Sequence, residues 1–205
     1  RHPRLGRWSR GLGDVYKRQG FGRTLAAIRA LPPLFIVVIE GAAMAGGLGI
    51  ACLADVVIAR TDARFALTEV TLGIPPAQIT PVVIERIGAS KARQLLLTAQ
   101  RFDGAAALEL GFVHFAEDDG EALECRLRSV LADGRRAAPG AVALTKDIID
   151  ACRSLDETAR VQFAAERFAD AMLGEEAREG MQAFAQKRAT SWSQPTDDAG
   201  NGDKA

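Results

Sequence analysis

Two uninterrupted apolar segments stand out in the first third of the sequence. Residues 34–39 are six consecutive apolar residues between two prolines and Glu40-Gly41, and Val56–Ala59 is a second such run. Strands that are buried on both faces, as in a parallel sheet, give this pattern. The connection from Gly41 to Ala54 suits a helical crossover and is too long for a hairpin, so we expect the two strands to be parallel.

Shorter elements are predicted between and after these runs. Residues 50–54 indicate a short buried helix, and the alternation of Ala63, Phe65 and Leu67 with polar or small residues indicates another strand. Capping residues and glycines then set the helix boundaries. They predict helices that start at Thr80, Ser90 and Asp103 and stop at Gly88, Thr98 and Gly111, followed by a strand at Phe112-Val113.

Changes in the pattern of apolar and polar residues divide the chain into four segments. Residues 1–20 have no clear periodicity, and we expect them to be disordered or artefactual. Residues 21–133 carry the strand–helix alternation and are expected to form an α/β core. Beyond Glu121 the sequence predicts helices broken at Gly134, Pro139, Ser154 and Gly174, and residues 134–192 form the expected helical oligomerisation region. Residues 193–205 are polar and are expected to form a disordered tail.

The charge balance and the polar segments exclude several functional classes. Lys+Arg and Asp+Glu both number 26, so no basic excess points to nucleic acid. No apolar run approaches the roughly 20 residues that span a membrane. The Arg-rich start has no apolar core typical of a secretory signal. Together these features predict a cytoplasmic protein without a nucleic-acid or membrane partner.

The cysteines and histidines predict neither a metal site nor a catalytic triad. Cys52, Cys125 and Cys152 are widely spaced and match no metal-binding pattern, so we expect reduced, buried thiols. His2 and His114 have no matching partners for a Ser-His-Asp arrangement.

Gly46, Gly47 and Gly49 form a glycine-rich turn after the first apolar run. A dinucleotide-binding fingerprint would need a third glycine or alanine where Cys52 stands, so that interpretation fails. Exposed N–H groups at the start of the following helix could bind an anion or an oxyanion. The alternative is close packing of helix and strand, for which glycine supplies the space.

Glu69 is the candidate acid/base residue. It follows the Ala63–Leu67 strand and stands among apolar residues, where a carboxylate can act as a general acid or base. A surface position is the alternative.

These segments, in this order, resemble the enoyl-CoA hydratase/isomerase, or crotonase, family over about residues 22–192. The resemblance implies a crotonase-like spiral of ββα units, truncated at its N-terminus, with a helical C-terminal region that forms a homotrimer or a dimer of trimers. The matching stretches are Glu40–Ala51 with Ala54-Asp55, Ala63–Glu69, Leu72–Pro76, Ile87-Gly88, Leu97-Thr98, Ala107–Val113 and Glu179–Arg188.

The resemblance also implies roles for the glycines and for Glu69. Family members hold the thioester oxygen of an acyl-CoA with two backbone N–H groups, and Gly46 matches one donor, with Gly47 and Gly49 in the same substrate-binding turn. Glu69 matches the second of the two glutamates that flank the attacking water in typical hydratases. The first glutamate falls at Gly49, where a substrate carboxylate or a water could use the free room.

A one-glutamate pattern is similar to that of hydratases acting on branched or carboxylated enoyl-CoAs, such as methylglutaconyl-CoA and isohexenylglutaconyl-CoA. The leading hypothesis is therefore a lyase that adds water to an enoyl-CoA. The alternatives are a double-bond isomerase and a non-catalytic acyl-CoA binding or interaction subunit. No metal or redox cofactor is implied, and CoA enters as part of the substrate. Lys187 and Arg188 could meet the CoA phosphates or belong to a solvated helix face.

Residues 1–19 do not resemble the family's first strands or its loop with the second oxyanion donor. Losing one such donor lowers a rate by about 10²–10³, and losing strands exposes a sheet edge. We therefore expect weak or no catalysis, and impaired stability, from the chain as written.

Overall fold

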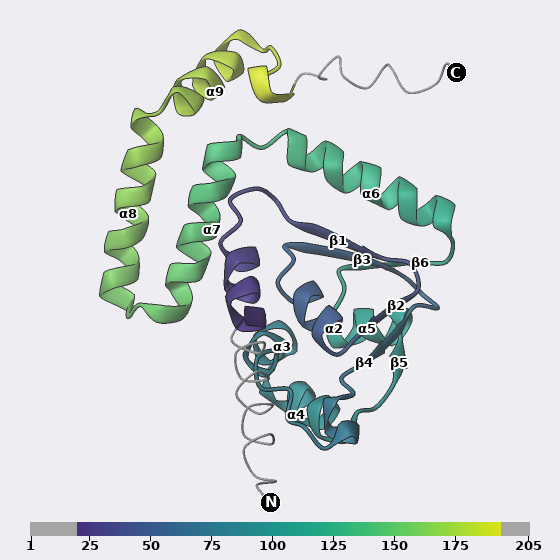
Figure 1. The fold of residues 1–205 in the computed structure, drawn as a ribbon. Helices are drawn as coiled ribbons and strands as arrows, with labels where there is room; N and C mark the ends of the chain where they lie inside the picture. Colours follow the sequence, from purple (N-terminus) through teal and green to yellow (C-terminus); the bar gives the residue numbers. More distant parts are fainter. Residues whose placement is uncertain (1–19, 194–205) are drawn as a thin grey trace, which may run out of the picture. The chain divides into compact units, whose positions relative to one another are not determined.

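The structure is a computed structural model that describes residues 20–193 (Figure 1). It divides into an α/β unit, Phe35–Arg128 with the chain up to Leu31, and a helical unit, Ser129 onwards with Pro32–Leu34. The α/β class with a helical C-terminal region agrees with the prediction. The division falls after Arg128, a few residues before the predicted position 133. The segments expected to be disordered, 1–19 and 194–205, lie outside the described residues.

The first sheet has the order β1-β3-β6 and is parallel throughout. Its strands are β1 Ile36–Ile39, β3 Val56–Arg60 and β6 Phe115–Glu117. The predicted parallel pair is confirmed, with Val37 opposite Val57. Burial of β1 on both faces is wrong for Ile36, Val37 and Val38, which are only partly buried. The reason is that β1 forms an edge of this sheet and β3 its centre.

A second sheet has the order β2-β4-β5. It contains β2 Ala42–Met44, β4 Arg64–Ala66 parallel to it, and β5 Phe102–Asp103 antiparallel to β4. The pattern predicted β4 and missed β2. The strand predicted at Phe112-Val113 is wrong, since β6 begins at Phe115. Phe112 is buried, but its N–H donates to Ala107 O at 2.9 Å and so closes the preceding helix.

Helices connect the strands of the α/β unit. Asp103 caps α5 by accepting from Ala106 N at 2.9 Å, as predicted. Thr80 is not a cap: its hydroxyl donates to Pro76 O at 2.8 Å, and Ile79 occupies the cap position. Ser90 is not a cap either, because α4 starts one residue earlier. The helices are one at 20–29, α2 Gly46–Ala51, η1 Glu69–Leu72, α3 Thr80–Ile87, α4 Ala89–Thr98, α5 Gly104–Leu110 and α6 Gly120–Arg135, which runs into the helical unit.

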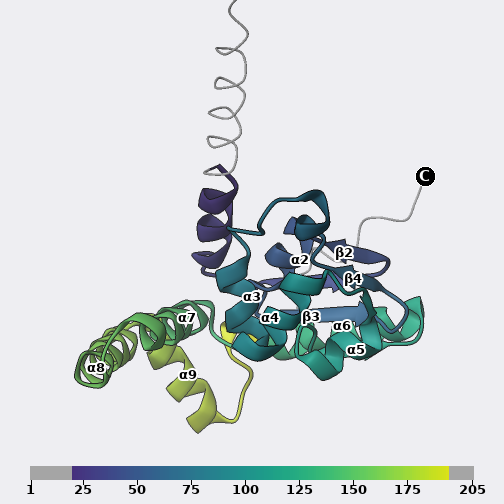
Figure 2. The ribbon, with the colours of Figure 1, turned by 90° about the horizontal axis from the view of Figure 1, so that it is seen from below.

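The core of the α/β unit lies around β3 and β4. Phe65, Phe102 and Phe112 stack in a row, with ring centroids 5.5 and 5.3 Å apart. Helix α5 contacts strands of both sheets, and α3 packs against α4 (Figure 2). The core therefore joins the two sheets into one rigid support for the loops that follow β2 and β4.

The helical unit contains α7 Pro139–Ser154, α8 Glu157–Leu173, α9 Glu175–Gln186 and the short η2 Ser191–Ser193. The predicted breaks at Pro139, Ser154 and Gly174 are confirmed. The break predicted at Gly134 is wrong, because α6 continues through it to Arg135 and a single glycine weakens a helix without ending it. Helices α7 and α8 lie side by side as a hairpin (Figure 1). Many large apolar side chains of these helices are exposed, from 45% for Met172 to 88% for Phe184.

The thiols differ from the prediction in their burial. Cys125 and Cys152 are exposed, so the expectation of buried thiols is wrong for both. Cys52 is mostly buried, and burial raises the pKa of its thiol to about 12. Within the described part of the chain, no helix has both the length and the apolar character needed to cross a bilayer.

A polar junction formed by Arg86 and His114 joins α3, α5 and β3. The Arg86 guanidinium donates to Phe112 O at 3.1 Å and to Ala54 O at 3.3 Å. Val57 N donates to His114 Nδ1 at 2.8 Å, so the neutral ring carries its proton on Nε2. Partial burial, followed by the nearby charge of Arg86, lowers the pKa of His114 below its ordinary value.

We expect the stability of the α/β unit to fall as the pH falls below about 6.5, the ordinary pKa of histidine. The unfolded chain takes up a proton at His114 before the folded chain does, so the free energy of unfolding decreases with falling pH until the folded pKa is passed. Protonated Nδ1 would face the Val57 N–H and the Arg86 cation. Urea titrations between pH 5 and 8 measure this slope, and H114Q should flatten it. An equal slope in H114Q would contradict the prediction.

Candidate active site

Glu69 and Gly46 line one pocket of the α/β unit, with a volume of about 140 Å³. Its walls come from the helix at 20–29, the start of α2, η1 and the segment that leads into α3. The pocket is mostly apolar, with two polar side chains, Glu69 and Gln78. Its lining residues are Phe21, Gly46, Glu69, Ile74, Pro75, Pro76, Gln78 and Ile79.

Glu69 begins η1 directly beyond β4, and the fold fixes its backbone. Ile74 N donates to Glu69 O at 3.3 Å, and Gly73 ends the turn with φ 72°, a left-handed conformation suited to glycine. The Glu69 Oε2 atom is buried and has no hydrogen-bond partner among the described residues. A buried carboxylate oxygen without a donor is unfavourable in the free protein. A water or a substrate that donates to it would satisfy it, which is what an acid/base carboxylate needs.

An unusual backbone turn between β2 and α2 places Gly46 in the lining of the pocket. Ala45 has φ 49° and ψ −122°, a conformation that residues other than glycine rarely adopt, and its N–H donates to Ala66 O at 2.8 Å. Strained backbone of this kind gathers at functional sites. The N–H groups of Gly46 and Gly47 lie in the first turn of α2, where no carbonyl of the same helix can accept from them. The Phe21 ring lies 3.2 Å from the position that a Gly46 side chain would take, so a larger residue there would have to displace this ring slightly.

The space beside Gly49, expected to hold a water or a substrate carboxylate, is not free. A side chain at Gly49 would start 2.3 Å from Ile79 Cγ2, so Ile79 fills this space and Gly49 is buried. The prediction of free room for a water or a substrate carboxylate is therefore wrong at this position. Close packing explains Gly49, whereas the open N–H groups belong to Gly46 and Gly47. The space beside Gly47 holds no atom within 4 Å.

The sequence did not single out Phe21, Gln78 and Ile79 as site residues. Phe21 and Ile79 are ordinary apolar residues whose place in the pocket depends on the packing of separate segments. Gln78 did carry a signal, as the one polar side chain in an apolar stretch from Ile74 to Ile79.

Arg188 and Lys187, expected to meet CoA phosphates, both belong to the helical unit. The Arg188 guanidinium donates to both carboxylate oxygens of Glu179, at 2.7 and 2.8 Å. This hydrogen bonding holds the pKa of Glu179 at about 2. Arg188 is thus engaged within its own chain, where it fixes the segment after α9, and Lys187 is an exposed residue at the C-terminal end of α9.

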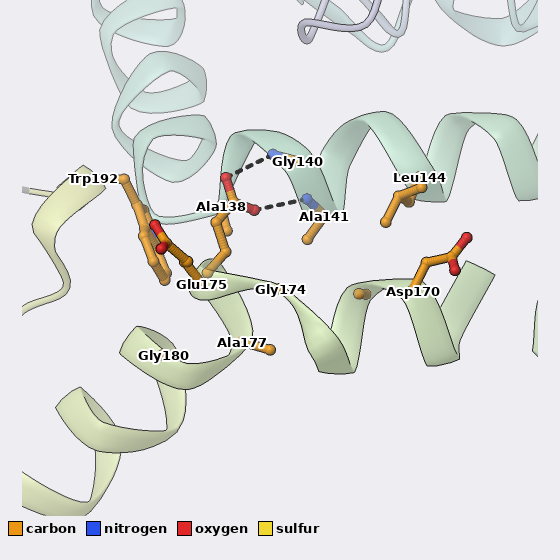
Figure 3. Close-up of a pocket in the computed structure, with 12 residues that line it drawn as sticks. Ala138, Gly140, Ala141, Leu144, Asp170, Gly174, Glu175, Ala177, Gly180 and Trp192 are labelled. Carbon is orange, nitrogen blue, oxygen red and sulfur yellow. Dashed lines mark hydrogen bonds between the residues drawn. The ribbon is translucent and has the colours of Figure 1, made fainter. Parts of the chain in front are cut away.

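A larger pocket, with a volume of about 360 Å³, lies within the helical unit (Figure 3). It is lined largely by alanine and glycine, with Trp192 on one side. Its carboxylate Glu176 accepts from Gly140 N at 2.9 Å and from Ala141 N at 3.1 Å, and so caps α7. Figure 3 shows these two bonds at the start of that helix. Glu176 therefore has a structural role, and the acid/base candidate remains Glu69. Nowhere between residues 20 and 193 do three His, Cys, Asp or Glu residues gather as a metal site would require.

Comparison with known proteins shows the family to which the chain is similar. The family described as enoyl-CoA hydratase/isomerase matches residues 13–195, a match that begins several residues before the motifs. Pseudomonas aeruginosa AtuE is 48% identical with a TM-score of 0.85, over 88% of this chain and 71% of that one. An enoyl-CoA hydratase/isomerase from Marinobacter aquaeolei is 39% identical with a TM-score of 0.83, over 86% of this chain and 67% of that one.

Two curated relatives are named as hydratases. Enoyl-CoA hydratase ACTT6 of Alternaria alternata is 39% identical over 68% of this chain and 48% of its own length. A probable enoyl-CoA hydratase of Bacillus subtilis is 32% identical over 78% of this chain and 63% of its own length. The chain thus spans about half to two thirds of these relatives. By the extent of the family match, this chain belongs to the enoyl-CoA hydratase/isomerase family.

Proposed function

We propose that the chain is the major part of an enzyme that adds water to an enoyl-CoA thioester, with Glu69 as the acid/base residue. The observation that carries this proposal is the buried, unpartnered Glu69 Oε2 in the same pocket as the open N–H groups that start α2. A carboxylate on one side and oxyanion donors on the other are the two groups that such a hydration requires.

Each group has a separate part in the proposed reaction. The oxygen of water forms a bond to the β-carbon while Glu69 takes one proton from that water. The electron pair of the double bond moves towards the thioester oxygen, where the Gly46 N–H stabilises the developing negative charge. Glu69 then returns the proton to the α-carbon. One carboxylate therefore completes the cycle without a net change in its own charge.

For the acyl group, the pocket lining favours an uncharged aliphatic chain over a carboxylated one. Ile74, Pro75, Pro76 and Ile79 supply an apolar wall, and no Lys or Arg lines the pocket among the described residues. A carboxylated acyl group, the other possibility from the sequence, would lie near the Glu69 carboxylate and would need a cation from elsewhere.

The second candidate is double-bond isomerisation, which the single carboxylate of the pocket also suits. Here Glu69 would move a proton between two carbons and no water would add. The test is to incubate the chain with a 2-enoyl-CoA and with a 3-enoyl-CoA, and to separate the products by chromatography. Formation of a 3-hydroxyacyl-CoA supports the hydratase. A conjugated product made from the 3-enoyl-CoA without hydration supports the isomerase, and binding without either product supports the non-catalytic subunit.

We propose in addition that copies of this chain associate through the helical unit, as a homotrimer or a dimer of trimers. The support is the exposure of large apolar side chains on α7, α8 and α9, such as Val161 at 67% and Phe168 at 66%. Burying these side chains between copies of the chain would remove apolar surface from water, which favours association.

A further inference from the structure

A site with one carboxylate provides a hydrogen-bond acceptor for only one of the two hydrogens of the attacking water. Glu69 can accept one of the two water hydrogens, and the position of a second glutamate is Gly49, which Ile79 covers. The other hydrogen needs an acceptor if the lone pair of the water is to point at the β-carbon. Among the side chains that line the pocket, Gln78 is the only other one with a hydrogen-bond acceptor.

Gln78 stands on a segment that internal hydrogen bonds fix in place. Pro76 O accepts from both Thr80 N, at 3.0 Å, and the Thr80 hydroxyl, at 2.8 Å. Ala77 N donates to Pro75 O at 2.8 Å. The next residue, Ile79, is buried against Gly49 and anchors the segment to α2. Gln78 is therefore held at the pocket by the same side chain that excludes a second glutamate.

The Gln78 side chain is partly buried, and its carboxamide makes no hydrogen bond to another described residue. Its Cγ lies 3.8 Å from the place of a side chain at Gly22, so the helix at 20–29 limits where the stem can go. Neither amide atom of Gln78 is among the buried atoms that lack a partner, so the carboxamide is open to a water or a bound group that can donate to its oxygen.

We propose that Gln78 is a catalytic residue, whose carboxamide oxygen accepts a hydrogen bond from the attacking water while Glu69 takes the other proton. No bond to Gln78 forms or breaks, and the amide stays neutral throughout. Gln78 thus serves as the second water-holding group in place of the glutamate missing at position 49. This inference rests on the proposed hydration, and its test also has a readout that needs no turnover.

The first experiment compares Q78L with the wild-type chain in hydration of crotonyl-CoA. Losing the hydrogen bond that orients the attacking water should lower kcat by about 10- to 100-fold with little change in KM. Q182L makes the same change at an exposed position of α9, outside the pocket, and should keep the wild-type kcat. Equal kcat values for Q78L and Q182L would overturn the proposal.

The second experiment measures binding by calorimetry with 3-hydroxybutanoyl-CoA and butanoyl-CoA. The 3-hydroxyl oxygen is the added water oxygen, so the wild-type chain should prefer the hydroxylated thioester by about fivefold or more, the value of one net hydrogen bond. Q78L should lose this preference and still bind butanoyl-CoA as the wild type does. An undiminished preference in Q78L, or none in the wild type, would overturn the role of Gln78.

Turnover and thioester binding together distinguish failure of the hydratase proposal from failure of the Gln78 proposal. A preference that depends on Gln78, without any turnover by the wild-type chain, supports Gln78 as the water-site residue and contradicts the hydratase. Turnover that is unaffected in Q78L supports the hydratase and contradicts Gln78. Failure to bind either thioester contradicts both.

Discussion

Replacing Glu69 by glutamine is expected to lower the hydration rate of this chain by at least about 100-fold, within the range of about 10²–10⁴ that one acid/base residue contributes. Glutamine has nearly the same shape, so the pocket of Phe21, Gly46 and Ile79 should keep its form. What the amide cannot do is accept a proton from water and return it to the α-carbon. The measurement is kcat for a 2-enoyl-CoA, together with calorimetric binding of butanoyl-CoA, which should change little.

The matched control is E109Q, which makes the same change at an exposed residue of α5. It should retain the wild-type kcat. E69Q should also unfold at the same temperature as the wild type or at a higher one, because it removes a buried carboxylate oxygen that has no donor. A kcat for E69Q close to that for E109Q would remove Glu69 from the mechanism.

The largest expected loss of stability comes from a substitution outside the candidate pocket, Gly104 to alanine. An added Cβ would lie 1.9 Å from Arg60 O and 2.9 Å from Arg60 C. These are backbone atoms of β3, which is paired on both sides, so they cannot move aside as a flexible side chain can. The Gly104 N–H also donates to Thr61 O at 2.9 Å, which holds α5 close to this strand.

We expect G104A to lower the free energy of unfolding by about 3 kcal/mol or more, at the upper end of the usual effect of overpacking. In a chain of this size that corresponds to a fall in Tm of roughly 6–12 °C. The control is G120A at the start of α6, where an added Cβ meets no atom within 4 Å. It should leave Tm unchanged or raise it slightly. Equal Tm values for the two variants would show that α5 can shift away from β3.

The sequence was sufficient for elements whose pattern is local. The apolar runs before Glu40 and after Asp55 predicted two strands, and the connection between them, too long for a hairpin, predicted that these strands are parallel. Asp103 predicted the start of α5, since a capping side chain acts on N–H groups only a few residues away. Thr80 and Ser90 have the same residue type as a cap, yet neither caps its helix. In the case of Thr80, its hydroxyl donates to Pro76 O instead.

The sequence also singled out Glu69 and Gly46, through a family resemblance that extends over most of the chain. It could not show that Glu69 Oε2 is buried without a donor, or that Gly46 shares a pocket with it. Both facts depend on how β2 and β4 lie beside each other, with Ala43 opposite Phe65. Such pairing joins segments about twenty residues apart, and no local pattern in either segment specifies it.

Gly49 and Gln78 show what the sequence determined about the pocket and what only the tertiary structure decided. The sequence determined that position 49 holds no carboxylate, and from that alone the side of the pocket next to Glu69 looked open. Only the tertiary structure showed that Ile79 fills the space and that Gln78 is thereby placed at the pocket. The physical reason is that packing is decided by volume: a missing side chain in one segment is filled by whichever side chain of another segment the fold brings against it.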